Sequence, residues 1–327
     1  MATVTRKRFD RLSTAEKLRY VNAVKRMKIY DINIGPNGTL QSPAAGGTYQ
    51  KFIIWHDTAA EHNTASFLPW HRVFLWEFEQ DLIKSDTQLG NDGNIGIPYW
   101  KWQFSDGLPG SPRGELWSDN FMGGNGVPVT SGPFSGPDWR VYPGGLGGLE
   151  RDIANGGRTL PTKNNAWDCQ LLNTYDIPPF SRSIVAPNDP ARSYRNVLEG
   201  FGRTIGSPGL HNNAHMWIGG HMSQVPIAPN DPVFYLNHCN VDFMWSNWQF
   251  MNPTNVAQYP SDPEIDTVGQ NLSGFPRKRS DVMLPWNGSN GTRVWTIEKS
   301  LNFQKMGDHF SLHNYAYDAN LGNLAFT

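Results

Sequence analysis

The sequence predicts a mainly α protein, a helical bundle with long loops and a few short strands at its periphery. Three observations lead to this fold class. Several segments repeat apolar residues at helical spacing, and two of them open with proline. The 33 glycines and 24 prolines among 327 residues predict long loops around a compact helical centre. Strand-like composition is found only in short segments near the C-terminal end.

Two helices are expected in the N-terminal part of the chain. Ser13 and Glu16 have the spacing of a capping box, in which each side chain bonds to the backbone amide of the other residue. A first helix should therefore begin there and run to about Lys28. A second helix is expected over residues 49–59, where Phe52 and its neighbours are apolar.

A third helix should be opened by Pro69, whose missing N–H would have no helical partner in a first turn, and should reach about Lys84. Residues 97–102 are expected to be a short extended segment. The next long stretch, 107–190, is rich in Gly, Pro, Asn and Ser and should be mostly loop, with a short helix near 167–172.

The C-terminal part of the chain should return to helices and then change to strands. Helices are expected over residues 191–201, 211–218 and 232–251, the last again opened by proline. Two short strands are expected over 294–297 and 310–317.

Composition and charge exclude several classes of function. A formal net charge of −1 gives no basis for binding nucleic acid or an anionic membrane, and no apolar run approaches the length of a membrane span. The basic first ten residues lack the apolar stretch of a secretory signal, which predicts a cytoplasmic location, with export alongside a partner as the alternative. Cys169 and Cys239 cannot build a disulfide framework, although one bridge between them is compatible with the sequence.

Six of the nine histidines fall into two sets of three, which is the main indication of function. His211 and His215 are four residues apart and share one face of a helix, and His238 would reach them from an opposing helix. Imidazole ligands without carboxylate or thiolate suit copper, zinc, iron or nickel. A single histidine is more often a surface or core residue than a ligand. Two trios within aromatic-rich helices instead predict a pair of metal ions sharing a small ligand. The trios are His56, His62, His71 and His211, His215, His238.

The residues around these histidines resemble a known family. Residues 62–72, HNTASFLPWHR, look like the first copper signature of the tyrosinase family. Residues 211–215 together with 231–242 resemble its second copper signature. Two shorter segments, 98–102 and 315–317, are similar to further family motifs, so the resemblance covers nearly the whole chain.

This resemblance implies a type-3 dicopper enzyme that uses O₂ as co-substrate. It assigns the first trio to copper A and the second to copper B, with His62 on a loop and the other five on facing helices. The residues before His62 are Ala60 and Glu61, so the thioether-forming cysteine of many eukaryotic members is missing. The implied reaction is ortho-hydroxylation of monophenols and oxidation of o-diphenols to o-quinones. The alternatives are a catechol oxidase or o-aminophenol oxidase without hydroxylation, or a haemocyanin-like oxygen carrier, against which size and the solitary domain argue.

Two further residues are implied in proton transfer. A phenol must lose its proton to bind copper, because its pKa in water is about 10. In bacterial members that this chain resembles, a Glu and the Asn after the first copper B histidine hold a water for this purpose. Asn212 matches that Asn, and Glu199 is the candidate for the Glu. The alternative for Glu199 is an exposed carboxylate on a surface helix.

Four more positions have expected roles in or beside the substrate pocket. Phe234, one turn before His238, should pack against its imidazole or the substrate ring, with plain core packing as the alternative. Val225 matches a position at the pocket mouth of similar bacterial members. Met216 stands where some members carry Arg, which predicts a changed preference for acidic substrates. Asp242, one turn after His238, either orients a metal ligand or forms a structural helix salt bridge.

The expected partners are small phenols, with a copper-delivery protein as an additional candidate. Many family members carry a C-terminal domain that plugs the active site, whereas this sequence ends ten residues after Tyr317. A single catalytic domain over residues 1–327 without such a plug is therefore expected. The physiological phenol and the oligomeric state do not follow from the sequence.

Overall fold

The computed structural model describes nine stretches of the chain, and all structural statements below refer to them. They are residues 2–29, 48–104, 114–136, 139–143, 147–177, 192–201, 209–252, 259 and 278–322. Parts of the predicted loop between 107 and 190, and the first residue of the helix predicted over 191–201, lie outside them.

The predicted mainly α architecture is confirmed. The helices are α1 (Thr14–Ile29), α2 (Tyr49–Ala59), α3 (Phe67–Gln88), α4 (Lys163–Gln170), α5 (Tyr194–Glu199), α6 (His211–Ile218), α7 (Val233–Met251) and α8 (Ile297–Ser300). The strands are β1 (Thr3–Arg6), β2 (Val282–Asn287), β3 (Val294–Thr296) and β4 (Asn314–Tyr317). They form two separate two-stranded sheets, β1 with β4 and β2 with β3, and side chains of both sheets, such as Val4 and Trp295, are buried in the core.

Local signals set the helix starts as expected. At α1 the Glu16 amide donates to Ser13 Oγ (3.2 Å) and the Ser13 amide donates to Glu16 Oε2 (2.8 Å), which is the predicted capping box. Pro69 lies in the first turn of α3, although that helix begins slightly earlier, at Phe67. The helix predicted near 167–172 is α4, and its N-cap Thr162 also closes a capping box.

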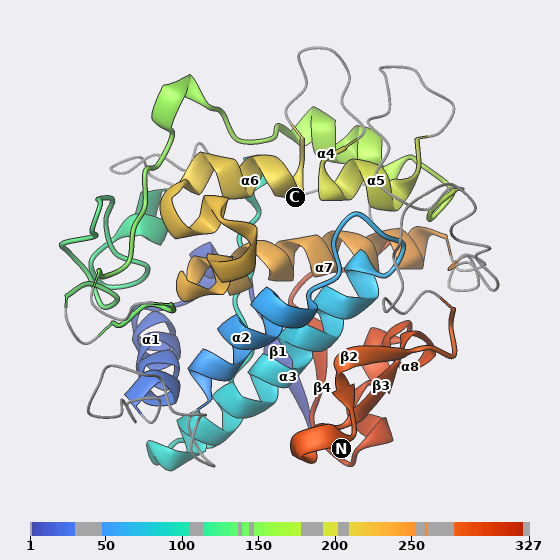
Figure 1. Ribbon diagram of the computed structural model, residues 1–327, viewed down its shortest axis with the longest axis horizontal. Helices are drawn as coiled ribbons and strands as arrows, with labels where there is room; N and C mark the ends of the chain where they lie inside the picture. Colours follow the sequence, from blue (N-terminus) through green and yellow to red (C-terminus); the bar gives the residue numbers. More distant parts are fainter. Residues whose placement is uncertain are drawn as a thin grey trace.

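Helices α2, α3, α6 and α7 make the centre of the molecule. Figure 1 shows α2 and α3 running side by side below α7, with α6 above it, and α3 and α6 both contact α7. Every residue of α7 from Val233 to Gln249 is buried, because the helix is surrounded by other elements. Side chains that point inward from these four helices therefore converge on one buried region.

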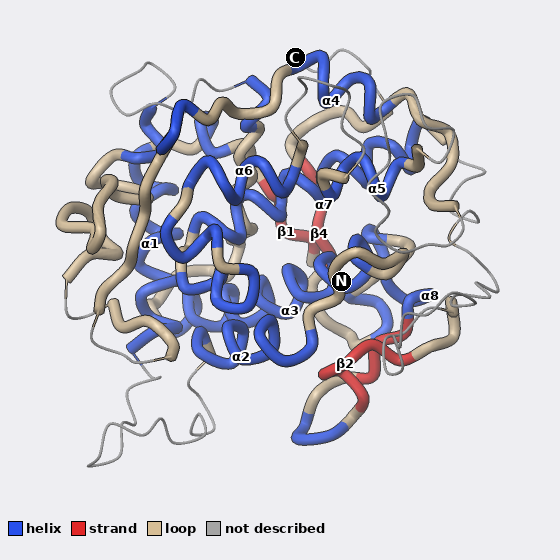
Figure 2. The backbone as a smooth tube through the Cα atoms, turned by 45° about the horizontal axis from the view of Figure 1, so that its top comes forward, coloured by secondary structure: helices blue, strands red, loops and turns tan. Residues whose placement is uncertain are grey.

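The two ends of the chain meet in a sheet that was not predicted from the sequence. Strand β1 pairs in parallel with β4, with Thr3 opposite Asn314 and Arg6 opposite Tyr317 (Figure 2). The strand predicted over 310–317 is thus confirmed only for its last four residues. Strand β2 was also not predicted, and it pairs antiparallel with β3.

Three further expectations concern the cysteines, membrane spans and the number of domains. Cys169 and Cys239 are both buried free thiols, so the bridge that the sequence left open does not form. None of the described helices is both long and apolar enough to cross a membrane. The expectation of a single domain stays a prediction.

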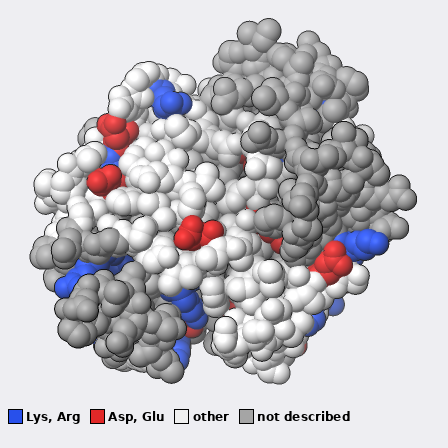
Figure 3. All heavy atoms as spheres, viewed as in Figure 1, with Lys and Arg blue, Asp and Glu red and all other residues white. Residues whose placement is uncertain are grey.

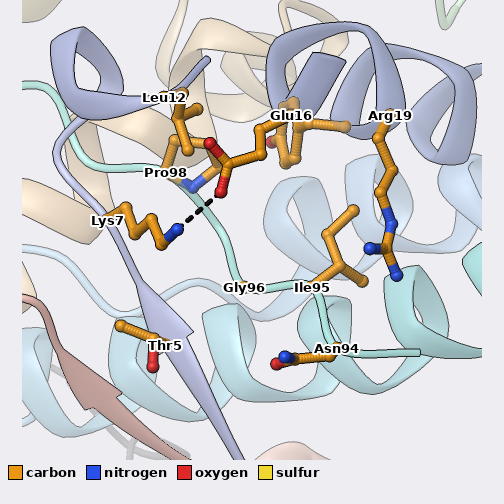
Figure 4. Close-up of a pocket in the computed structure, with 10 residues that line it drawn as sticks. Thr5, Lys7, Leu12, Glu16, Arg19, Asn94, Ile95, Gly96 and Pro98 are labelled. Carbon is orange, nitrogen blue, oxygen red and sulfur yellow. Dashed lines mark hydrogen bonds and ion pairs between the residues drawn. The ribbon is translucent and has the colours of Figure 1, made fainter. Parts of the chain in front are cut away.

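The charged side chains of the described surface lie in small separate groups on the face that Figure 3 presents. A polar cavity of about 210 Å³ lies between β1, α1 and residues 94–98 (Figure 4). There Lys7 is paired with Glu16 (2.5 Å), and Arg19 is paired with Asp86 (2.6 Å), so the charges at this cavity already have partners. None of its described lining residues is a histidine.

Candidate metal centre

The first histidine trio is assembled from α2, α3 and the loop between them. His56 lies on α2, His71 lies in α3, and His62 lies on the connecting loop. One nitrogen of each ring lies within 4.8 Å of the others. The three ring centroids are 4.9–5.7 Å apart. This is the predicted arrangement, with a single ligand supplied by a loop.

The second trio is assembled from α6 and α7. His211 and His215 are one turn apart on α6, and His238 comes from α7. Nε2 of His238 lies 3.1 Å from Nε2 of both other histidines. Three ring nitrogens therefore converge on one point.

The two trios adjoin, so they form one centre and not two separate sites. The rings of His71 and His238 stack with centroids 4.4 Å apart and planes inclined by 13°. Phe67 lies against both trios, with ring centroids 4.7 Å from His71 and 5.0 Å from His211. No role was predicted for Phe67, although it lies within the first copper signature.

Backbone carbonyls fix which ring nitrogen is free for a metal ion. Four of the histidines have Nδ1 beside a carbonyl oxygen, and since a carbonyl can only accept, Nδ1 carries the proton and Nε2 keeps its lone pair. The pairs are His56 with Pro226 (3.3 Å), His71 with Phe67 (2.9 Å), His211 with Glu199 (3.3 Å) and His215 with Met222 (2.8 Å). Nε2 of His56 and of His71 is buried and has no hydrogen-bond partner among the described residues. Buried acceptors without partners are what a bound metal ion would satisfy.

Burial keeps these imidazoles neutral, as metal ligands must be. It lowers the pKa of His56 to about 3 and that of His215 to about 4. The pKa values of the other four are lowered well below the ordinary range, again chiefly by burial. Cys239, beside His238, directs Sγ to the Ile97 carbonyl oxygen (3.5 Å) and not to the centre. An all-imidazole donor set fits copper.

The copper-free chain should lose stability as the pH falls below about 6.5, the usual pKa of histidine in an unfolded chain. The histidine pKa values are lowered in the folded state, so as the pH falls the unfolded chain binds protons before the folded chain does. The stabilisation is complete above that pH and decreases by up to about 1.4 kcal/mol per pH unit for each histidine. Urea unfolding of chelator-treated protein at several pH values measures this slope. A His56→Asn variant should show a smaller slope, and an identical slope would contradict the prediction.

Comparison with known proteins identifies the centre. The model of a protein family described as the common central domain of tyrosinase matches residues 45–251. The chain belongs to the tyrosinase family. The tyrosinase of Streptomyces glaucescens is 33% identical, covering 87% of this chain and 93% of that protein. Grixazone synthase of Streptomyces griseus is 36% identical, covering 90% of this chain and 99% of that protein.

Solved structures share the fold of this chain. A mutant polyphenol oxidase from Thermothelomyces thermophila aligns with a TM-score of 0.62 at 23% identity, covering 97% of this chain and 89% of that chain. A functional unit of octopus hemocyanin aligns with a TM-score of 0.59 at 18% identity, covering 99% and 69%. As a member of the tyrosinase family, the protein is a copper-dependent phenol oxidase with a pair of copper ions, and the two histidine trios fit these two ions.

The predicted pocket residues lie around the trios. The Phe234 ring is stacked on His238 (centroids 4.1 Å apart, planes inclined by 26°) and also contacts His56 (5.0 Å), so it packs against ligands of both trios. Val225 begins the 3-10 helix η6 (Val225–Asn230) and is 54% exposed. Met216 directly follows His215 and is 39% exposed. Both apolar side chains are accessible, and Met216 is adjacent in sequence to the half-buried His215.

Glu199 and Asn212 lie beside the copper B histidines. Glu199 is buried, so the alternative of an exposed surface carboxylate is wrong. Its carboxylate accepts from the Asn63 amide (2.6 Å) and from Arg195 Nη1 (2.9 Å). Oδ1 of Asn212 lies 3.0 Å from Nδ1 of His211. No roles were predicted for Asn63 or Arg195.

The Asp242 carboxylate forms buried salt bridges with Arg72 and Arg6. Its carboxylate bonds to Arg72 (2.5 Å), Arg6 (3.0 Å) and the hydroxyls of Tyr315 (2.7 Å) and Tyr317 (2.5 Å). None of its side-chain hydrogen bonds within the described stretches reaches a histidine. Its ion-pair partners come from β1 and α3 and its hydroxyl partners from β4, so these bonds join α7 to three other elements.

Proposed function

We propose that copper A is held by His56, His62 and His71 and copper B by His211, His215 and His238, and that the enzyme hydroxylates monophenols as well as oxidising catechols. The observation that supports this most is the pair of adjoining, neutral three-imidazole sites, linked by the stacked rings of His71 and His238. When bound, the copper pair supplies the redox chemistry that couples O₂ reduction to phenol oxidation. For a monophenol, one O₂ is consumed and the products are one o-quinone and one water.

The chain itself must accept the phenol proton, and Glu199 with Asn212 is the proposed place. Both Glu199 oxygens already accept one hydrogen bond, and each carboxylate oxygen keeps a further lone pair for a water molecule. Burial raises the pKa of Glu199 to about 7, and Arg195 only partly opposes this. Bound copper ions would favour the charged carboxylate. Gly200 brings Asn212 close, since a Cβ added to Gly200 would lie 2.8 Å from Asn212 Cβ.

The substrate ring would be held between apolar groups. Phe234 supports the His238 and His56 imidazoles from within, and Val225 and Met216 offer apolar contacts at the accessible edge of the centre. Neither rim position carries a charge, which supports neutral or weakly charged phenols as substrates.

A Met216→Arg variant should shift the preference toward carboxylated phenols. This position beside His215 is 39% exposed, so a guanidinium there would attract a substrate carboxylate mainly while the substrate approaches the site. KM for an acidic phenol should therefore fall about two- to fivefold, and KM for a neutral phenol should stay unchanged. The ratio of kcat/KM for the two phenols measures the effect. A Met216→Gln variant of similar length is the control, and equal ratios in both variants would sink the proposal.

Oxygen uptake by copper-loaded and copper-free protein, with a monophenol and a catechol offered separately, tests the function. Copper-dependent uptake with both substrates is the expected result. Oxygen uptake with catechol alone would mean that the enzyme oxidises catechols but does not hydroxylate monophenols. This second candidate calls for a separate assay with an o-aminophenol, because similar relatives carry different names, tyrosinase and grixazone synthase. A copper-delivery partner and a cytoplasmic location stay predictions from the sequence.

A further inference from the structure

His62 depends on a loop for its position, unlike the other five histidines. Its neighbour Asn63 has φ +63°, in the left-handed region that asparagine adopts more readily than most other non-glycine residues. Because asparagine is not confined to this conformation, contacts around the turn help to select it. The position of His62 therefore depends on the contacts that hold this turn of the loop.

The contact that holds Asn63 is made by Glu199, which lies beside the copper B histidines. The Asn63 amide donates a short hydrogen bond of 2.6 Å to Oε1 of Glu199, at the C-terminal end of α5. The donor and acceptor are 136 residues apart in the sequence. A bond from a backbone amide to a buried carboxylate is of the strong, charge-assisted kind.

Glu199 is itself fixed by a buried ion-pair chain. Arg195 Nη1 donates to Oε2 of Glu199 (2.9 Å), while Nε and Nη2 of the same guanidinium donate to Asp176 (2.9 and 3.2 Å). Ser193 Oγ adds a bond to Asp176 (2.8 Å). The side chains of Arg195, Asp176 and Glu199 are at most 1% exposed, so little water competes for these bonds.

The backbone of Glu199 reaches the other trio. Its carbonyl oxygen lies 3.3 Å from Nδ1 of His211. One residue therefore contacts a copper B ligand through its backbone and the copper A loop through its side chain.

We propose that Glu199 is a positioning residue that sets the two histidine trios relative to each other, its carboxylate holding the His62 loop through the Asn63 amide and its carbonyl orienting His211. This role rests on the assignment of His62 to copper A and is separate from proton transfer. It acts on metal binding, with or without substrate.

A second anchor limits the damage when the carboxylate is removed. The Tyr175 hydroxyl donates to the Ala65 carbonyl (2.6 Å), three residues beyond His62. The loop should therefore remain attached to the fold in a Glu199 variant while the turn at Asn63 loosens. Because side-chain substitution keeps the Glu199 carbonyl, the copper B ligand His211 keeps its contact.

Copper retention tests the proposal without any activity assay. Holoenzyme of wild type, Glu199→Ala and Glu199→Gln is dialysed against graded concentrations of a copper chelator, and copper per chain is measured. In Glu199→Ala, one of the two coppers should leave about ten- to a hundredfold more readily, as for other changes to groups that support a metal ligand. Gln offers one acceptor oxygen to two donors, so Glu199→Gln should lie between the two. Tyr194→Phe is the matched control, because it removes a buried hydrogen bond on the same helix, to Gln170, that does not reach the loop.

The outcomes separate this proposal from the ligand assignment. Retention of both coppers as in wild type by Glu199→Ala, or by Glu199→Gln if the alanine variant does not fold, would overturn the positioning role. Parallel loss of both coppers would overturn it too, since it predicts the loss of one. A His62→Ala variant that keeps both coppers would overturn the assignment of His62 itself. One copper lost in His62→Ala but none in Glu199→Ala would leave that assignment intact.

Discussion

Replacing His238 with alanine should lower copper-dependent oxygen uptake more than about a hundredfold, with both monophenol and catechol. A loss of this size is larger than the loss expected from removing a group that only supports a metal ligand. Its Nε2 lies 3.1 Å from Nε2 of both His211 and His215, and no other residue of the described chain completes that trio. The imidazole also fills the space between His71 (4.4 Å) and Phe234 (4.1 Å). Copper content should fall from two ions per chain to one.

His313→Ala is the matched control for this change. His313 belongs to neither trio, and its hydrogen bonds to Trp76 and Gln80 are made by its backbone, which the substitution keeps. Copper per chain and oxygen uptake should both match wild type. Two coppers retained in His238→Ala, together with measurable uptake, would show that the proposed copper B site is wrong.

Local sequence signals were sufficient for the elements that carry the histidines. The bounds of α2 and α6 are those predicted, Tyr49–Ala59 and His211–Ile218, and α7 begins one residue after the predicted Pro232. In these segments apolar spacing and proline at a helix start act within a few residues. The trios themselves followed from histidine spacing and from the resemblance of their surroundings to a known family.

Contacts between distant segments could not be predicted in the same way. Strand β1 has no apolar alternation that would mark it, and it is a strand because β4, more than 300 residues later, pairs with it. The bond from Asn63 to Glu199 likewise joins residues 136 positions apart. The residue pattern of a single sequence contains no information on which distant residues pair. The same reason explains why the sequence alone left open whether Glu199 is a surface carboxylate and which role Asp242 has.

Replacing Asp242 with asparagine should destabilise the copper-free chain by about 3–5 kcal/mol, the usual loss when one partner of a buried ion pair is removed. Burial alone would raise the pKa of Asp242, but Arg72, Arg6 and the two tyrosine hydroxyls outweigh it and the pKa is lowered. Asparagine keeps the volume but removes the charge that faces two buried guanidiniums. Arg6 retains Glu79 (2.9 Å), whereas Arg72 keeps only uncharged partners among its hydrogen bonds in the described residues.

Urea unfolding of the copper-free variants at neutral pH measures this loss, with Glu298→Gln as the control. Glu298 pairs with Arg279 at the surface and is 57% exposed, so its change should stay within about 0.5 kcal/mol. Because the folded-state pKa of Asp242 is lowered, its stabilisation exists above the unfolded value of about 4 and is lost at lower pH. The difference in unfolding free energy between wild type and Asp242→Asn should therefore become smaller at acidic pH. Unchanged stability combined with weaker copper retention would instead return Asp242 to a role in orienting a metal ligand, acting through Arg72 and its neighbour His71.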